Sequence, residues 1–335
     1  MKPSLSNLLR WAAVPFVFAI SANLGLASPP TDVNKAALSQ PRILSYQSGA
    51  SGFHTKTYAF DSGRELVFFD SQFDPKFTKE FIHSIQNQPQ SKPAYLVITH
   101  ANPDKFNGIS TFKELFPEIK VITSRNVAAE LPGVHAYKKY YFTEIAKSYQ
   151  ADTYPRLGPI DLTFQKTYTI SLEGGMHVIL NELTNAAVAS HHVTASIPSL
   201  NQVVVGDIIH HKAHAWLEGP IINGKAMPDV AAWAKALDEL YASYPRNPMV
   251  LAGRGKTVDL KAAVTEQKRY LSRAQTLVKD FLKKENIRPQ DLQSAHAAAI
   301  YRKLSQRFAS AYPDYEFAYM IEYGVYSFVG KLLEN

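Results

Sequence analysis

Three groups of ionisable side chains in this chain each stand where an apolar run ends. The first group is THANPDK at residues 99–105, the second joins His191 and His192 to Gly-Asp at 206–207, and the third is GRGK at 253–256. Residues at strand ends can converge on one pocket at the edge of a sheet. Histidine, aspartate, lysine and arginine at such a rim suit metal binding, proton transfer or anion stabilisation.

The order and spacing of these groups resemble the metallo-β-lactamase superfamily. Its first motif, T-H-x-H-x-D-H, is similar to 99–105, its strand-end Gly-Asp to 206–207, and its late P-G-H-G turn to AGRG at 252–255. The resemblance runs over residues 43–257, and ELVFFD at 65–70 is similar to the early buried hairpin. It implies an α/β fold, a four-layer αββα sandwich, here followed by a C-terminal helical extension.

The departures from this family pattern fall on the metal ligands. Asn102, Lys105 and Arg254 stand where the family has histidines, and Val188 stands at the place of its middle histidine. An arginine has no lone pair to donate, and a lysine donates only after losing its proton. We therefore expect the dinuclear zinc centre to be lost from this degenerate motif.

Charge balance predicts what occupies the rim instead of two metal ions. Two close, unpaired carboxylates, Asp104 and Asp207, are costly to bury, whereas paired carboxylates are easier to accommodate. We therefore predict salt bridges from Lys105 and Arg254 to these two aspartates.

Two arrangements for a single zinc ion stay open. In the first, the metal ligands are His100, His191 or His192, and Asp207, with Asn102 as a weak oxygen donor. In the second, Asp207 is joined by the histidines that follow it closely, which are His210, His211 and His214. A solvated loop is the alternative for His210 and His211. The predicted cofactor is therefore none or one zinc ion.

The remaining site predictions concern roles at the rim. The residues predicted to be catalytic, if chemistry occurs there, are Asp104, Lys105 and Arg254. The residues predicted to line the pocket are His100, Asn102, His214 and Trp216, with His214 as a wall that orients substrate. Tyr137, Tyr140 and Tyr141 beside Lys138 and Lys139 are interpreted as a partly exposed helix face.

Three functions follow from these residues. The first is binding of a small molecule or a partner, with weak or no metal-dependent hydrolysis, and the number of lost ligands favours it. The alternative is a mononuclear zinc-dependent hydrolase of an ester, lactone, amide or phosphoester, with Asp104 as base or orienting group. The third is a metal-independent enzyme in which Lys105 or Arg254 stabilises an oxyanion.

Hydrophobic periodicity predicts strand–helix units around a strand-rich middle. A helix is expected to begin at Pro75, since proline suits the first helical position. Strands are expected at 58–60, 65–69, 94–98, 119–123, 162–164, 168–170, 177–180, 193–197, 202–205 and 248–252. Further helices are expected at 107–115, after Pro228, and at 260–284, 289–311 and 315–333.

Composition limits the function classes. With 335 residues and 46% hydrophobic residues the chain is globular, and a mostly disordered protein is excluded. It has no cysteine, which excludes disulfides, thiolate metal sites and cysteine nucleophiles. The net charge of +7 is modest and comes without a dense Lys/Arg block, so a small-molecule partner is expected and a nucleic acid is not.

The N-terminus reads as a secretory signal. Lys2 and Arg10 flank an apolar run at 11–22, and Gly25-Leu26-Ala27 supplies small residues for cleavage near Ala27. The run is about a dozen residues, shorter than the ~20 of a spanning helix, so no stable membrane anchor is expected. We predict an exported protein, periplasmic or secreted. Its expected parts are a signal peptide at 1–27, a flexible linker at 28–42, the metallo-β-lactamase-like domain at 43–258 and the helical extension at 259–335, packed on that domain.

Overall fold

The structure, a computed structural model, describes residues 40–86, 91–293 and 296–334. The signal peptide predicted at 1–27 and nearly all of the linker predicted at 28–42 lie outside these described residues. Arg42, which was expected in the linker, is the first residue of strand β1 (Arg42–Gln47). Within the described ranges, no helix combines the length and the apolar character needed to cross a membrane.

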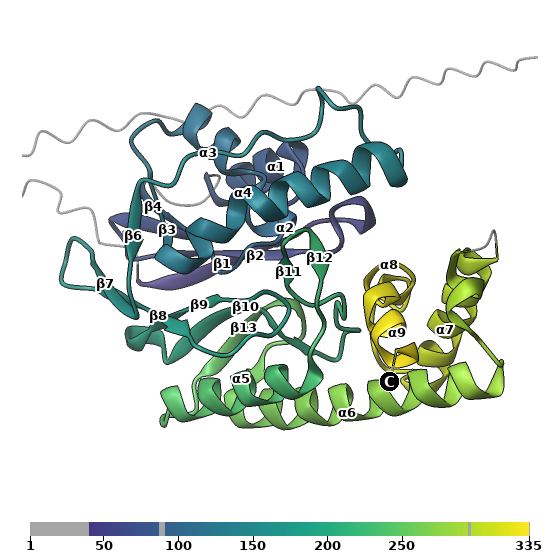
Figure 1. Cartoon of the computed structure of the whole chain (residues 1–335). Helices are drawn as coiled ribbons and strands as arrows, with labels where there is room; N and C mark the ends of the chain where they lie inside the picture. The colour runs from purple at the N-terminus through teal and green to yellow at the C-terminus, as the bar shows by residue number, and fades with distance from the viewer. Residues whose placement is uncertain (1–39, 87–90, 294–295, 335) are drawn as a thin grey trace, which may run out of the picture. The chain divides into compact units, whose positions relative to one another are not determined.

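The first half of the chain forms a six-stranded sheet whose spatial order follows the sequence order. β1, β2 and β3 are antiparallel neighbours, and β3 to β6 are parallel. Its remaining strands are β2 (Lys56–Asp61), β3 (Glu65–Phe69), β4 (Lys92–Val97), β5 (Lys120–Ser124) and β6 (Leu162–Phe164). The helices that cover its outer face are α1 (Pro75–Gln86), α2 (Pro103–Phe106), α3 (Ile109–Leu115) and α4 (Arg125–Tyr140), as Figure 1 shows.

The second half forms another six-stranded sheet, in the order β14-β13-β10-β9-β8-β7. β10 and β13 run parallel, while their other neighbours run antiparallel. The strands are β7 (Thr167–Ser171), β8 (His177–Leu183), β9 (His192–Ile197), β10 (Gln202–His211), β13 (Met249–Gly255) and β14 (Val258–Asp259). Helices α5 (Val230–Ser243) and α6 (Leu260–Lys284) cover this sheet, and a hairpin of β11 (Ile221–Ile222) and β12 (Lys225–Ala226) reaches toward α4 (Figure 1).

The two sheets pack face to face between the helix layers. β10 illustrates the period-two burial that this requires: Val204 belongs to the core between the sheets, whereas Val203 and Val205 belong to the core under α5 and α6. The predicted four-layer αββα sandwich is therefore confirmed. α6, which was expected to open the C-terminal extension, is itself part of the outer helix layer, since it contacts β10 and β13.

Two helical predictions were wrong in detail. The helix expected at 315–333 begins only at α8 (Met320–Gly324) and continues as α9 (Tyr326–Leu333), because the backbone of Glu316 pairs instead with residues 212–214, just after β10. A left-handed residue, Phe317, follows at once with φ of 65°. The stretch at 289–311 contains a short 3-10 turn, η4 (Pro289–Gln293), and then α7 (Ala297–Ala311).

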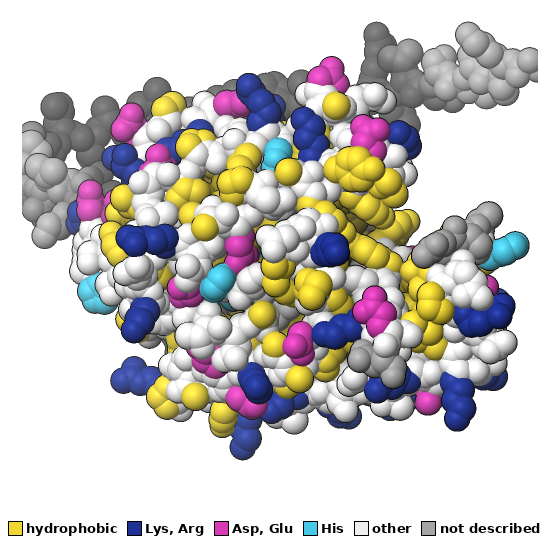
Figure 2. Space-filling view, in the orientation of Figure 1, with side chains coloured by type: hydrophobic (Ala, Val, Ile, Leu, Met, Phe, Trp, Pro, Cys, Tyr) yellow, Lys and Arg dark blue, Asp and Glu magenta, His cyan; other side chains and the backbone are white. Residues whose placement is uncertain are grey.

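Of one long helix, α4, only the C-terminal end was predicted, as the helix face at Tyr137 and Tyr140. Pro132 and Gly133 stand in its middle, and both residues weaken a helical pattern in the sequence. It runs on directly into η2 (Tyr141–Ile145), which is π-helical. Figure 2 shows hydrophobic side chains gathered over this end of α4, where Tyr140 and Ile145 are each 60% exposed. The predicted exposed helix face is therefore confirmed for Tyr140.

His214 lies in the core of the C-terminal helices, so its assignment to a pocket wall was wrong. Its side chain is fully buried among aromatic rings of α6, α7 and the segment after α7, with centroids 5.9 Å from Tyr270, 5.8 Å from Phe308 and 5.6 Å from Tyr315. Its Nδ1 lies 3.1 Å from the Tyr270 hydroxyl. Burial lowers the pKa of His214 to about 4.

This burial makes His214 a source of acid sensitivity. The unfolded chain takes up a proton near pH 6.5, whereas the folded chain does so only near pH 4, so stability rises with pH across that interval. His214→Gln should reduce the slope of unfolding free energy against pH by about 1.4 kcal/mol per pH unit. Urea unfolding between pH 4.5 and 7.5 measures both slopes, and identical slopes would contradict the assignment.

Candidate functional site

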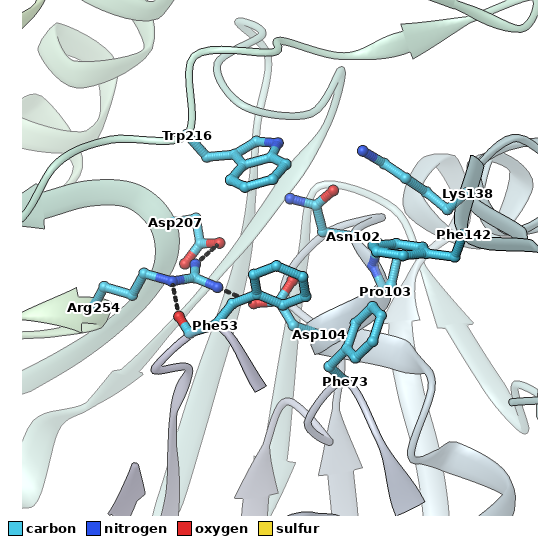
Figure 3. Close-up of a pocket in the computed structure, with 10 residues that line it drawn as sticks. All are labelled: Phe53, Phe73, Asn102, Pro103, Asp104, Lys138, Phe142, Asp207, Trp216 and Arg254. Atoms are coloured by element: carbon cyan, nitrogen blue, oxygen red, sulfur yellow. Dashed lines mark hydrogen bonds and ion pairs between the residues drawn. The ribbon is translucent and has the colours of Figure 1, made fainter. Parts of the chain in front are cut away.

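Four charged side chains meet between the two sheets and form a closed ion-pair cluster. Asp104 and Lys105 lie on α2, just after β4, while Asp207 lies in β10 and Arg254 in β13. The Lys105 Nζ is 2.9 Å from Asp104 Oδ2 and 2.9 Å from Asp207 Oδ1. Arg254 donates from Nη2 to Asp104 Oδ2 at 2.8 Å and from Nη1 to Asp207 Oδ2 at 2.6 Å. Each cation therefore contacts both carboxylates, as Figure 3 shows for Arg254.

Two glycines make the close approach of these strands possible. A Cβ on Gly253 would stand 1.9 Å from Asp207 Oδ1 and 2.9 Å from Lys105 Nζ, so a side chain there would displace the cluster. Gly206, with φ of 58°, takes the left-handed conformation just before Asp207, and its Cβ would stand 2.6 Å from Thr99 Oγ1. The Gly-Asp and Gly-Arg pairs of the sequence therefore place the charged residues where they meet.

The cluster is buried and fully ionised. Burial alone raises the pKa of Asp104 and of Asp207, but Lys105 and Arg254 outweigh it and hold both values below their usual range. Burial likewise opposes the charge on Lys105, yet the two aspartates raise its pKa, and they also raise that of Arg254. Two negative and two positive charges compensate one another. The predicted salt bridges are thus present, with each cation shared by both carboxylates.

His100 and His192 lie beside this cluster, fully buried, with ring centroids 4.9 Å apart. The Thr99 hydroxyl lies 2.9 Å from both oxygens of Asp70 and 2.9 Å from His100 Nδ1, so Nδ1–H can donate to Thr99 while Thr99 donates to Asp70. His100 Nε2 then turns its lone pair toward Asp207 Oδ2, 3.8 Å away. Burial lowers the pKa of His100 well below its usual value and that of His192 to about 4, so both rings are neutral.

Of the other histidines predicted as metal ligands, His210 lies beside the cluster, as the register partner of Arg254, whereas His191 and His211 interact with other groups. His191 is half-exposed and hydrogen-bonds through Nδ1 to Glu130, which raises its pKa. His210 is buried within β10, so the loop interpretation was wrong for this residue, and burial lowers its pKa to about 4. His211 ends the same strand. In the part of the chain that the structure describes, no three His, Cys, Asp or Glu side chains are grouped to hold a metal ion.

The donor atoms near His100 do not fit a zinc site. Both oxygens of Asp207 are already held by Lys105 and Arg254, and His192 Nε2 accepts a hydrogen bond from the Ala189 backbone at 3.1 Å. Among these donors of the described residues, His100 Nε2, His192 Nδ1 and Asp207 Oδ1 lack hydrogen-bond partners, and Asp207 Oδ1 is held by its ion pair with Lys105 alone. A zinc ion takes three or four protein ligands, so it would have to displace a cation from Asp207.

A small pocket opens over the cluster, with an empty volume of about 340 Å³ including its mouth. Asp104, Asp207 and Arg254 contribute to its floor, and aromatic rings form its walls (Figure 3). The residues that line it are Phe53, Phe73, Asn102, Pro103, Asp104, Lys138, Phe142, Asp207, Trp216 and Arg254. Of the predicted pocket residues, Asn102 and Trp216 line this space. His100 is buried behind it and His214 lies outside it.

The ion-pair cluster also holds one aromatic wall of the pocket in place. Arg254 donates from Nε to the carbonyl oxygen of Phe53 at 2.8 Å. Phe53 and His54 have φ of 60° and 50°, a left-handed conformation that is strained for bulky residues and persists only where the surroundings enforce it. His54 stacks on Phe317, with ring centroids 4.3 Å apart, which fixes the loop from its other side.

Another buried carboxylate, that of Glu218, organises the opposite wall. It is 1% exposed and accepts hydrogen bonds from Lys138, from Trp216 Nε1 at 2.8 Å and from the Tyr326 hydroxyl. The Lys138 ammonium also stands 5.5 Å from the Trp216 ring centroid. α4 and α9 are therefore both tied to the pocket through one carboxylate. Neither Glu218 nor the pocket role of Lys138 was predicted, because the 80 residues that separate these two side chains leave no local pattern in the sequence.

Comparisons with known proteins agree with this fold. No protein-family model matches the chain. A metallo-β-lactamase type 2 of Bacillus sp. (strain 170) is 37% identical over 54 residues, and that of Bacillus cereus is 35% identical over 54 residues. Each alignment covers 16% of this chain and only 21% of the relative's length.

Solved structures extend the likeness to most of the described domain. A metallo-β-lactamase from Pontibacter korlensis aligns with a TM-score of 0.51 and 16% identity, over 70% of this chain and 99% of that chain. A double mutant of the sec-alkyl sulfatase PisA1 aligns with a TM-score of 0.52 and 13% identity, over 69% of this chain and 40% of that chain. The protein therefore has the metallo-β-lactamase fold, and its resemblance to that superfamily is confirmed at the level of the fold. The catalytic roles of Asp104, Lys105 and Arg254 stay predictions.

The ion-pair cluster predicts strong coupling between its members. Arg254→Ala leaves two carboxylates with one cation and should cost about 3–5 kcal/mol of stability. Asp207→Asn combined with Arg254→Ala should recover part of that loss, because charge balance returns. Chemical unfolding of the single and double variants measures the coupling. Arg64→Ala, at an exposed ion pair with Glu173, is the control and should change stability by less than about 1 kcal/mol. Additive losses from Arg254→Ala and Asp207→Asn would contradict the cluster.

The Glu218 contacts generate a second prediction. Glu218→Gln leaves the buried Lys138 without its anion and should cost about 3–5 kcal/mol, whereas Tyr326→Phe removes one hydrogen bond to a charged group, about 1.5–3 kcal/mol. Adding Lys138→Met to Glu218→Gln should restore part of the stability. Glu173→Gln, at an exposed ion pair, serves as the matched control. The result to be measured is the melting temperature, and equal effects of Glu218→Gln and Glu173→Gln would refute the role given to Glu218.

Proposed function

We propose that this protein is an exported small-molecule-binding protein of the metallo-β-lactamase fold, with weak or no metal-dependent hydrolysis. One observation carries the proposal: Lys105 and Arg254 already satisfy the two carboxylates that a metal ion would need. The pocket above them is small and walled by aromatic rings, as in many small-molecule sites. Export rests on the basic, apolar and small-residue pattern of residues 1–27.

The second candidate is a mononuclear zinc hydrolase of an ester, lactone, amide or phosphoester. The unpartnered His100 Nε2 and His192 Nδ1 favour it, since two neutral histidines side by side suit a metal ion. The engagement of Asp207 by two cations weighs against it. A metal-independent enzyme is weaker still, because the charges of Lys105 and Arg254 are already compensated and an oxyanion would have to compete with Asp104 and Asp207.

Metal content tests the proposal directly. The protein purified without chelator should hold fewer than one tightly bound transition metal ion per chain, because Arg254 and Lys105 already contact both oxygens of Asp207. Elemental analysis measures this. A content of about two zinc ions per chain would contradict the proposal. A content of about one would favour the mononuclear hydrolase instead.

A ligand-restoring variant provides the matched control. With Asn102→His, Lys105→His and Arg254→His combined, added zinc should raise the melting temperature through its binding to the folded state. The wild-type protein should show no such rise at the same zinc concentration. An equal rise in both proteins would mean that the wild-type site binds zinc after all.

A further inference from the structure

Four aromatic rings form the walls of the pocket over the ion-pair cluster. Phe53 and Phe73 meet edge-to-face with centroids 5.0 Å apart, and Phe73 and Phe142 also lie 5.0 Å apart. The ring centroids of Trp216 and Phe53 lie 6.0 Å apart, and the two ring planes make an angle of 73°. These rings present both faces and edges to the pocket (Figure 3), so a flat ring can stack or pack edge-to-face within it.

Every charged group at the pocket is already compensated. Arg254 and Lys105 neutralise Asp104 and Asp207 at the floor, and Glu218 neutralises Lys138 at the wall. A ligand carboxylate would have to compete with Glu218 or with the aspartates, and a ligand cation would meet carboxylates that already have partners. Since separating buried ion pairs is costly, a charged ligand is disfavoured.

Two hydrogen-bond donors are available to a neutral ligand. The Asn102 side chain stands at the N-cap position of α2 without making a capping hydrogen bond, and it makes none to any other described residue. Asn102 is 8% exposed, and its amide reaches the pocket side on which Trp216 lies (Figure 3). The Lys138 ammonium has three protons, and the structure gives it one hydrogen-bond acceptor, Glu218. An oxygen acceptor on the ligand can therefore receive hydrogen bonds from Asn102 and Lys138.

We propose that this pocket binds an uncharged, flat aromatic ring that carries a carbonyl or hydroxyl oxygen, the ring lying among Phe53, Phe142 and Trp216 and the oxygen accepting from Asn102. This inference rests on the small-molecule binding proposed above and names its ligand class. The empty space over the cluster, about 340 Å³ with the open solvent at its mouth included, is small, so the ligand is limited to a single ring that lies partly in the mouth.

Four matched probes test the ligand class. Benzamide has the ring, the neutral charge and the oxygen, whereas benzoate adds a negative charge, benzylammonium replaces the carbonyl group by a positively charged group, and cyclohexanecarboxamide removes the flat ring. Ligand-observed NMR titration of the purified protein measures the four dissociation constants. We expect benzamide to bind at least about tenfold more tightly than each of the other three probes.

Substitutions in the pocket test whether benzamide binds there. Asn102→Leu should weaken benzamide binding about tenfold while leaving the melting temperature unchanged, because its side chain makes no hydrogen bond within the described protein. Trp216→Leu should weaken it as well, whereas Tyr241→Leu, at an exposed tyrosine of α5, should not. Unchanged benzamide affinity in Asn102→Leu would overturn the assignment.

The probe titrations and the metal analysis test the ligand class and the proposed function independently of each other. Tighter binding of benzoate or benzylammonium, equal affinities for benzamide and cyclohexanecarboxamide, or no binding of any probe would each overturn the ligand class. The proposed absence of a metal centre is decided by elemental analysis of the same sample. Two zinc ions per chain would therefore remove the proposed function whatever the probes show.

Discussion

The structure depends on one electrostatic constraint, which is that two carboxylates buried between the sheets must be neutralised. Asp104 and Asp207 each contact Lys105 and Arg254, so four charges sum to zero among residues that are at most 5% exposed. Such a cluster is destabilising when one member is missing and tolerable when all four are present. Gly253 follows from this constraint, because no other residue leaves room for Asp207 and Lys105 beside the β13 backbone.

The neutralisation of these two carboxylates also affects the shape of the pocket over the cluster, through a contact between Arg254 and the backbone of Phe53. Arg254 uses one nitrogen for the Phe53 carbonyl and the other two for the carboxylates, so its orientation fixes both the floor and a wall. The left-handed conformation of Phe53 and His54 is held from one side by Arg254 and from the other by Phe317. The shape of the pocket is therefore linked to the charge balance of the cluster, through the strained loop at Phe53 and His54.

Charge balance could be read from the sequence, but long-range packing could not. Lys105 and Arg254 stand at ligand positions of a motif whose order sets the strand ends, so their pairing with Asp104 and Asp207 follows from residue type alone. The place of Glu218 depends on α9, and that of His214 on aromatic rings of α6, α7 and the segment after α7, all of which lie far away in the sequence. His214 near Trp216 looks like a pocket residue, yet the backbone pairing of His214 with Glu316 turns it into the C-terminal core.

Replacing metal ions by side-chain cations changes what the floor of the site can do. A metal ion accepts lone pairs from a ligand, whereas a guanidinium and an ammonium offer only hydrogen bonds, and here the carboxylates already receive them. The floor therefore stabilises the fold without offering an open coordination position. The groups that remain to contact a ligand are those of the pocket wall, which consists of aromatic rings together with Asn102 and Lys138. The ligand binding proposed for this site would thus depend on ring packing and a few donors, because the charged groups of the site are paired with one another within the protein.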